Sequence, residues 1–409
     1  MSREQGEAVA ERENRAALGA GLFTSGVWDM LSIVVPHYAA AVGLGVAEIG
    51  LVVAARSVLP TALSIHGGIL MDQFGIRRVL LWLAMACAAL PLLYPASGWF
   101  AMLVTLQLLL GLATSLGMAA AQTWNLQASH GDMAMLARFS IVSRIGTFLG
   151  PVVVGATWDL FGAWAAFACV SLSGAGIVAS AVYAAPGGAS GFQQVSAPPI
   201  RGADAIRALV PRWADHKQAI ALAAIPAVAF VLAASFLRNA PGSIQASLYV
   251  VYLADIGMTG TIIGALVAIS ELFGVFGSMM AASLERVMRG DRLLIACIAS
   301  SIAAIAVTPL VGHVLLLLVV ASIVRGIAQG ISQPLMYSIL GRAAPSTRHG
   351  ASVGLRAAVV RLASIVTPAV MGIIAEIWSI ETSFYVVGTV LLLACAALVV
   401  ASRGLALKG

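Results

Sequence analysis

Long apolar blocks occupy most of the chain, and short polar segments separate them. A helix that spans a membrane needs about 20 mostly apolar residues. Blocks of that length recur throughout the 409 positions. The pattern predicts twelve spanning helices, at residues 17–43, 46–73, 78–95, 99–123, 133–157, 161–184, 218–254, 258–284, 291–310, 312–338, 347–376 and 382–402. We therefore expect an all-α membrane protein.

The longest polar gap, 186–217, lies between the sixth and seventh predicted helices and is rich in Gly, Ser, Pro and Arg. This composition is typical of a linker. It divides the chain into two six-helix halves, 1–185 and 218–409. Composition agrees with a membrane protein, because only 10% of the residues are charged, where soluble chains carry roughly 25%.

The basic residues of the connections and termini fall on one side of the predicted bundle. The connections near Leu44, Ala96, Leu160, Asp255 and Glu381 contain no Lys or Arg, and we call this side the arginine-free face. The opposite, basic face carries Arg3, Arg12, Arg15, Arg77, Arg78, Arg201, Arg207, Arg212, Lys217, Arg286, Arg289, Arg292, Arg342, Arg348, Arg403 and Lys408. The positive-inside rule places both termini and the linker in the cytoplasm.

The formal net charge of +6 is explained by this topology, so no nucleic-acid partner is expected. The Ala-rich, Lys-poor composition is typical of a bacterial chain. We therefore expect the protein to be integral to a bacterial inner membrane.

The sequence repeats itself at a spacing of 217 positions. Arginine and proline are both unexpected inside apolar helices, so their joint recurrence outweighs matches among the many Gly and Ala residues. The matched pairs are Arg144 with Arg361, Pro151 with Pro368, Gly155 with Gly372, Asp159 with Glu376, and Phe167 with Phe384. We interpret the repeat as two homologous halves, each with one arginine deep in an apolar helix.

The sequence shows no arrangement that is typical of an enzyme. It contains no nucleophile elbow, phosphate loop or metal-ligand cluster. Four cysteines lie one each in the third, sixth, ninth and twelfth predicted helices, without metal-ligand spacing, and are expected to pack as small apolar residues. We expect no catalytic residue, no metal and no cofactor.

The connection after the second predicted helix reads Gly68-Ile-Leu-Met-Asp72-Gln-Phe-Gly75-Ile-Arg77-Arg78. Its glycines permit a tight turn, and its aspartate can pair with an arginine at the membrane surface. The pattern resembles the signature loop of the major facilitator superfamily. This resemblance implies a twelve-helix transporter fold in two halves, with Gly68, Asp72, Gly75, Arg77 and Arg78 as a conformational latch between them.

Two further motifs resemble those of the same family. The first, Gly146-x-x-x-Gly150-Pro151-x-x-x-Gly155, resembles the fifth-helix motif of the superfamily's antiporters, in which small residues allow close packing and proline bends the helix. The resemblance implies a helix-bending role for Gly146, Gly150, Pro151, Gly155 and the repeated Pro368. The second, Arg325-x-x-x-Gln329-Gly330, resembles a fourth-helix motif associated with proton coupling, although here it lies in the tenth predicted helix.

Seven charged residues are predicted near the middle of the membrane. Arg144 lies about twelve residues into its helix, roughly 18 Å at ~1.5 Å per residue, close to the centre of a ~30 Å core. A charge at a helix centre costs about 2.5–3.5 kcal/mol on insertion scales, so these side chains are expected to face water or a partner. The same count places Asp29, Arg56, Arg238, Glu271, Arg325 and Arg361 deep, and Arg356 nearer the basic face.

Arginines outnumber acids in this set, so the expected ligand is an anion. A guanidinium offers two parallel donors to a carboxylate or phosphate. If the halves are pseudo-symmetric, Arg144 and Arg361 face each other across a central cleft. The expected substrate-binding residues are Arg144, Arg361, Arg56, Arg238 and Arg325, with Trp28, Phe236, Tyr249, Tyr252 and Tyr337 as candidates for an aromatic wall.

These side chains also have a structural interpretation. Arg56 or Arg144 can pair with Asp29, and Arg325 or Arg238 can pair with Glu271, as ion pairs that hold helices together. Arg356 can extend to the membrane surface, and the aromatic side chains can simply pack.

Glu271 and Asp29 are the expected proton-coupling residues. A carboxyl group in apolar surroundings can take up a proton as substrate leaves. Glu271 is favoured because it lies in the same half as Arg325. The alternative is that both acids only compensate the charge of arginines.

We therefore expect a secondary active transporter that moves a small organic anion, a mono- or dicarboxylate, by alternating access with proton coupling or exchange. A proton-driven multidrug efflux antiporter is favoured by the fifth-helix motif and disfavoured by the arginine surplus. A membrane sensor would need a soluble output domain, and none is visible in the sequence. The expected partners are the substrate, protons or a counter-anion, and the lipid bilayer. The resemblance implies a monomer.

Overall fold

The computed structural model describes residues 3–129, 132–184, 226–343 and 349–404, and its regular elements in these ranges are helices. The N-terminal half contains α1 (Arg3–Ala41), α2 (Val46–Phe74), α3 (Ile76–Ala89), the 3-10 helix η1 (Leu90–Leu93), α4 (Phe100–Ala128) and α5 (Met133–Tyr183). The C-terminal half contains α8 (Pro226–Gln245), α9 (Leu248–Asp255), α10 (Gly260–Glu285), α11 (Gly290–Ala306), α12 (Thr308–Val311), α13 (Leu315–Ala343), α14 (His349–Ile377) and α15 (Ile380–Gly404). The predicted linker at 186–217 lies outside the described residues, so the boundaries of the halves stay a prediction.

The described helices make twelve crossings. Within the described ranges, nine helical segments are long and apolar enough to span a membrane, namely α1, α2, α3 with η1, α4, α5, α10, α13, α14 and α15. The long helix α5 reverses at Gly162 and so fills the places of the fifth and sixth predicted helices, and the pairs α8 with α9 and α11 with α12 fill those of the seventh and ninth. The predicted all-α membrane fold is confirmed.

The fifth and sixth crossings are the two arms of α5. They meet at Gly162, whose φ of 78° and ψ of −172° are not helical. A side chain would be strained at this φ, so glycine allows the chain to reverse without a longer loop. The turn lies on the arginine-free face, where the sequence predicts the connection between these two helices.

The seventh and ninth crossings are interrupted, whereas the sequence predicts a continuous helix for each. The predicted helix 218–254 breaks at Ser247, which has φ −139° and ψ −105° and separates α8 from α9. The predicted helix 291–310 breaks at Val307, between α11 and α12. Hydropathy averaged over a helix length does not register these breaks, because apolar residues on both sides outweigh the short run of small and polar residues at 241–247 and the Thr-Pro at 308–309.

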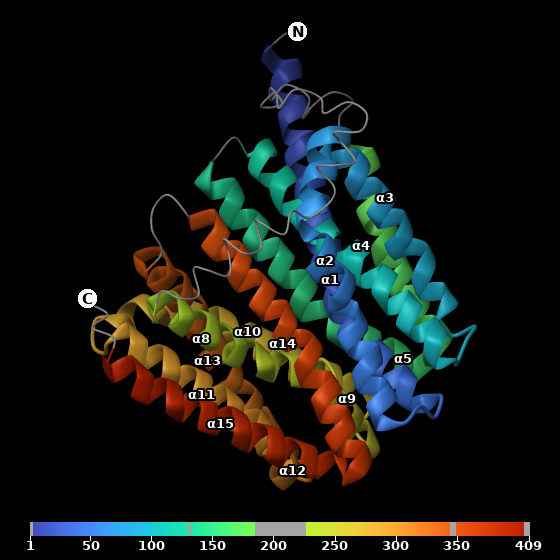
Figure 1. Cartoon of the computed structure of the whole chain (residues 1–409). Coiled ribbons are helices and arrows are strands. Elements are labelled where there is room, and N and C mark those ends of the chain that lie inside the picture. The colour runs from blue at the N-terminus through green and yellow to red at the C-terminus, as the bar shows by residue number, and fades with distance from the viewer. Residues whose placement is uncertain (1–2, 130–131, 185–225, 344–348, 405–409) are drawn as a thin grey trace, which may run out of the picture.

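Each half packs mainly on itself, and the halves meet along two pairs of helices. Within the halves α1 lies against α5 and α10 lies against α13. Between the halves the largest contacts join α2 with α14 and α5 with α10. In Figure 1 the orange-red α14 runs beside the blue α2, and the blue-to-green half lies above and to the right of the yellow-to-red half.

The repeated phenylalanine is a core residue in both halves. Phe167 is fully buried and stacks on Tyr94, with ring centroids 4.8 Å apart. Phe384 is equally buried and lies 5.8 Å from the ring of Tyr252. The repeat therefore marks equivalent packing positions, as expected for two homologous halves.

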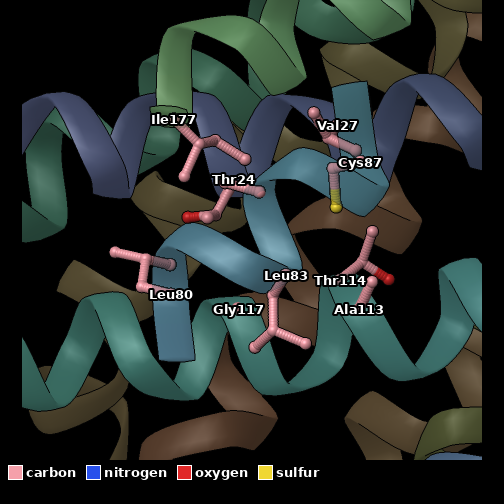
Figure 2. A pocket seen from close by; sticks show the side chains of 10 residues that line it. Thr24, Val27, Leu80, Leu83, Cys87, Ala113, Thr114, Gly117 and Ile177 are labelled. Carbon is pink, nitrogen blue, oxygen red and sulfur yellow. The ribbon is translucent and has the colours of Figure 1, made fainter. Parts of the chain in front are cut away.

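A small apolar cavity lies inside the N-terminal half, between α1, α3, α4 and the second arm of α5 (Figure 2). Thr24, Val27, Cys87 and Ile177 are among the side chains that line it. Its lining contains no charged residue, and it is too narrow to hold water. It is a feature of packing, and Cys87 is a buried free cysteine there.

Candidate functional site

Arg56 is held inside the N-terminal half. Its side chain is only 6% exposed. One guanidinium nitrogen donates to the carbonyl oxygen of Trp28 at 2.6 Å, and the guanidinium carbon lies 3.7 Å from the centre of the Trp28 ring. A cation over an indole face is stabilised by the ring quadrupole. Trp28 thus contacts an arginine of its own half.

Arg325 has a similar environment in the C-terminal half. It is 2% exposed, and its guanidinium lies 5.2 Å from the ring centre of Tyr249. Its Nε lies 3.4 Å from the hydroxyl of Ser270, and one of its Nη atoms is buried without a hydrogen-bond partner. Each half therefore encloses one arginine against an aromatic ring.

The two acids predicted at mid-membrane come from opposite halves and lie within electrostatic range of each other. Asp29 on α1 and Glu271 on α10 are both half-buried and interact electrostatically. Asp29 also interacts with Arg56, and Glu271 with Arg325. In the described part of the chain neither acid forms a direct ion pair. Each acid instead interacts at longer range with the other acid and with arginines.

Arg144 and Arg361 each reach toward the opposite half. Arg144 on α5 is exposed, and it interacts electrostatically with Glu271. Arg361 on α14 is half-buried, and it donates to the carbonyl oxygen of Pro60 and, at 3.4 Å, to the hydroxyl of Ser115. They lie in the two separate contacts between the halves, α5 with α10 and α14 with α2.

Arg238 on α8 lies in a polar network that the sequence did not predict. Its Nε donates to Ser332 at 2.7 Å, and an Nη donates to the side-chain oxygen of Gln333 at 2.8 Å and to the carbonyl oxygen of Gln329 at 3.1 Å. The spacing of 329, 332 and 333 places these groups on one face of α13. That spacing was the available signal, although single serines and glutamines in apolar helices are poor signals.

Asn239, the next residue on α8, extends this network to α14. Its amide nitrogen donates to the hydroxyl of Ser364 at 2.8 Å and to the carbonyl oxygen of Val360 at 3.0 Å. The polar network of α8, α13 and α14 therefore supplies amide and hydroxyl groups beside the arginines.

The predicted latch is described only in part. Gly75 ends α2 with φ 85°, as expected for a glycine turn. Arg77 donates to the carbonyl oxygens of Ala181 at 2.7 Å and Ala184 at 3.0 Å, at the end of α5 in its own half, and Arg78 is exposed. The side chains at positions 68 and 72, and that of Tyr337, lie outside what the structure describes. A latch between the halves remains a prediction.

The glycines of the fifth-helix motif serve two different contacts. A Cβ at Gly146 would overlap the carbonyl oxygen of Leu22, and one at Gly150 would press on Gly26, so both glycines let α5 approach α1. Gly155 instead lies against Gly260 of the other half. Pro151 and Pro368 interrupt helical hydrogen bonding in α5 and α14.

Two six-helix halves that meet along paired helices, with charged groups midway, define the architecture of a membrane transporter. The chain belongs to the Major Facilitator Superfamily, whose family model matches residues 17–238 and residues 231–405. Members of this superfamily are transporters, which assigns the chain to that class and not to the enzymes.

Solved structures agree with this assignment. A mutant form of the nucleoside transporter NupG superposes with a TM-score of 0.79 at 14% sequence identity, covering 95% of this chain and 99% of NupG. A second NupG structure has a TM-score of 0.76 at 14% identity and covers 96% of this chain and 99% of NupG. At this identity the similarity shows the fold alone. No curated protein matches the chain.

Proposed function

We propose that the protein is a secondary active transporter of a small organic anion, a mono- or dicarboxylate, across the inner membrane. The observation that carries the proposal is the balance of charge at mid-membrane, where five arginines face two acids. Asp29 and Glu271 compensate at most two of them, and Arg56 and Arg325 are the enclosed ones beside these acids. The surplus positive charge therefore lies on the less enclosed arginines, Arg144, Arg238 and Arg361.

Arg144 is the arginine best placed to meet an anion. Its side chain is exposed, and its partner among the described residues is Glu271, through an electrostatic interaction without a hydrogen bond. Arg361 adds a second guanidinium, and Arg238 adds a third that is already oriented by Ser332 and Gln333. Guanidinium groups bind carboxylates through two parallel hydrogen bonds, so a small carboxylate suits this set.

Transport by alternating access would use the two contacts between the halves as the moving interface. We assign the basic face to the cytoplasm by the positive-inside rule. Asp29 and Glu271 are the proposed proton-coupling residues. Two carboxylates that repel each other across the interface lose that repulsion when either binds a proton, so protonation and the position of the halves would be linked.

A nucleoside is the second candidate substrate, favoured by the similarity to NupG over 95% of this chain. The polar network around Asn239, Gln333 and Ser364 offers amide and hydroxyl groups that suit a sugar or a base. A nucleoside is uncharged, so this candidate leaves the arginine surplus without a role in recognition.

The proposal is tested by thermal stabilisation of the purified protein in the presence of carboxylates, phosphate esters, nucleosides and cationic drugs. A ligand at ~100 times its Kd stabilises the folded state by about 2.7 kcal/mol, which is visible as a melting shift. We expect a carboxylate to shift the unmodified protein and to lose most of its effect in Arg144→Ala and Arg361→Ala. Arg286→Ala, an exposed arginine on the basic face, is the matched control and should respond normally.

Other outcomes would replace the proposal. A shift by nucleosides that survives both arginine substitutions would establish the second candidate. A shift by cationic drugs alone would mean that the arginines are structural and that the protein is a drug exporter.

A further inference from the structure

The repeated residues of α5 and α14 lie in the two contacts between the halves. Arginine, proline, glycine and acid follow one another at intervals of seven, four and four in both helices, which places them on one helical face. In α5 this face ends at Asp159, and in α14 it ends at Glu376. Both acids are at the arginine-free ends of their helices.

Asp159 reaches across to the first turn of α10 in the other half. Its carboxylate accepts hydrogen bonds from the backbone N–H groups of Gly260 and Thr261, both at 2.7 Å, and from the Thr261 hydroxyl at 2.5 Å. The first N–H groups of a helix have no partner within it, and the helix dipole favours a negative charge there. An acid of one half therefore caps the N-terminus of a helix of the other half.

Glu376 makes the equivalent contact at the second interface. Its carboxylate accepts a hydrogen bond from the backbone N–H of Ala47, at 3.3 Å, in the first turn of α2. Another acid, Glu48, caps the same turn from within α2 by accepting from the Gly45 N–H at 3.0 Å. The contact of Glu376 is longer and single, so the Asp159 contact is the tighter of the two.

Glycines bring the backbones together just inside these acids. A Cβ at Gly264 would overlap the carbonyl oxygen of Pro151, and a Cβ at Gly50 would overlap that of Pro368. Further along, Arg361 contacts Pro60. Both interfaces are thus closed from the arginine-free face to mid-membrane.

We infer that Asp159 and Glu376 are paired latches that hold the arginine-free side of the transporter closed. Each latch is a carboxylate of one half that caps a helix of the other half. Opening of this side would require the hydrogen bonds of both caps to break. The close contacts of Gly264 with Pro151 and of Gly50 with Pro368 would then separate. The inference rests on rocking of the two halves and is independent of the substrate.

The test measures the distance between the halves at the arginine-free face. Spin labels are placed on Trp99→Cys of the N-terminal half and Leu310→Cys of the C-terminal half, two side chains that are 81% and 71% exposed. The four native cysteines are replaced by alanine. Distances are recorded in lipid for Asp159→Asn, Glu376→Gln and the double variant. Glu48→Gln, which alters an acid that caps within one half, is the matched control.

Each latch substitution should raise the ratio of the long-distance to the short-distance population, by about tenfold for Asp159→Asn, and less for Glu376→Gln. The double variant should have a higher ratio than either single variant, and Glu48→Gln should have the same ratio as the parent. If Asp159→Asn does not fold, Thr261→Val removes one donor without altering the acid. Unchanged distances in the latch variants, or an equal change in Glu48→Gln, would refute the inference, whatever ligand the protein binds.

Discussion

Single residues of the same type have different roles in this protein. Arg56 and Arg325 are enclosed by aromatic rings within their halves, whereas Arg144 is exposed and Arg361 bonds to the opposite half. The sequence predicts all four as deep charges but does not distinguish them. Their surroundings come from helices far away in the chain, so depth can be counted from sequence and exposure cannot.

The electrostatic interaction of Asp29 with Glu271 predicts how a single substitution affects proton coupling. We expect Glu271→Gln to abolish transport driven by an imposed pH gradient, because the amide cannot carry the coupled proton, while exchange of substrate for substrate continues. Both activities are measured in proteoliposomes with a radiolabelled carboxylate. Asp255→Asn, which changes an exposed acid on the arginine-free face, is the control. Retention of pH-driven transport by Glu271→Gln would show that this acid only compensates arginines.

Glycines decide where two helices of this fold can pack closely against each other. The sequence identifies Gly146, Gly150 and Gly155 as one motif, and the structure divides them between α1 in the same half and α10 in the other. A motif shows that close packing occurs but does not name the partner helix. The breaks at Ser247 and Val307 were missed for a related reason, since hydropathy has no term for backbone conformation.

This division predicts different effects for two glycine substitutions. Gly146→Ala should lower the free energy of unfolding by about 1–3 kcal/mol, because its Cβ would press on Leu22 inside one half. Gly264→Ala should cost less stability, because the halves can part to relieve the overlap with Pro151. Unfolding in detergent measures the first effect, and the spin-label pair measures the second. Equal destabilisation, with no change in distance for Gly264→Ala, would show that α5 and α10 do not separate.

At the scale of the whole molecule, most of the architecture could be predicted. Apolar blocks and the alternation of basic connections gave the number of crossings, and the repeat of 217 positions indicated two related halves. The expectation that Arg144 and Arg361 form one site across a cleft stays a prediction. Pseudo-symmetry relates their positions, but it does not make their neighbours equal, because Glu271 lies opposite one and Pro60 opposite the other.

That asymmetry leads to a prediction about the whole transporter. Arg361 bonds to Pro60 and Ser115 across the interface, so Arg361→Ala removes a contact between the halves as well as a positive charge. Without any ligand, we expect it to raise the population with a long distance between the labels at positions 99 and 310. Arg144→Ala should leave that population close to the parent's, because among the described residues the interaction of Arg144 with the other half is electrostatic and involves no hydrogen bond. Identical distance distributions for the two variants would mean that the arginines are equivalent, and that the symmetry of the sequence extends to the mechanism.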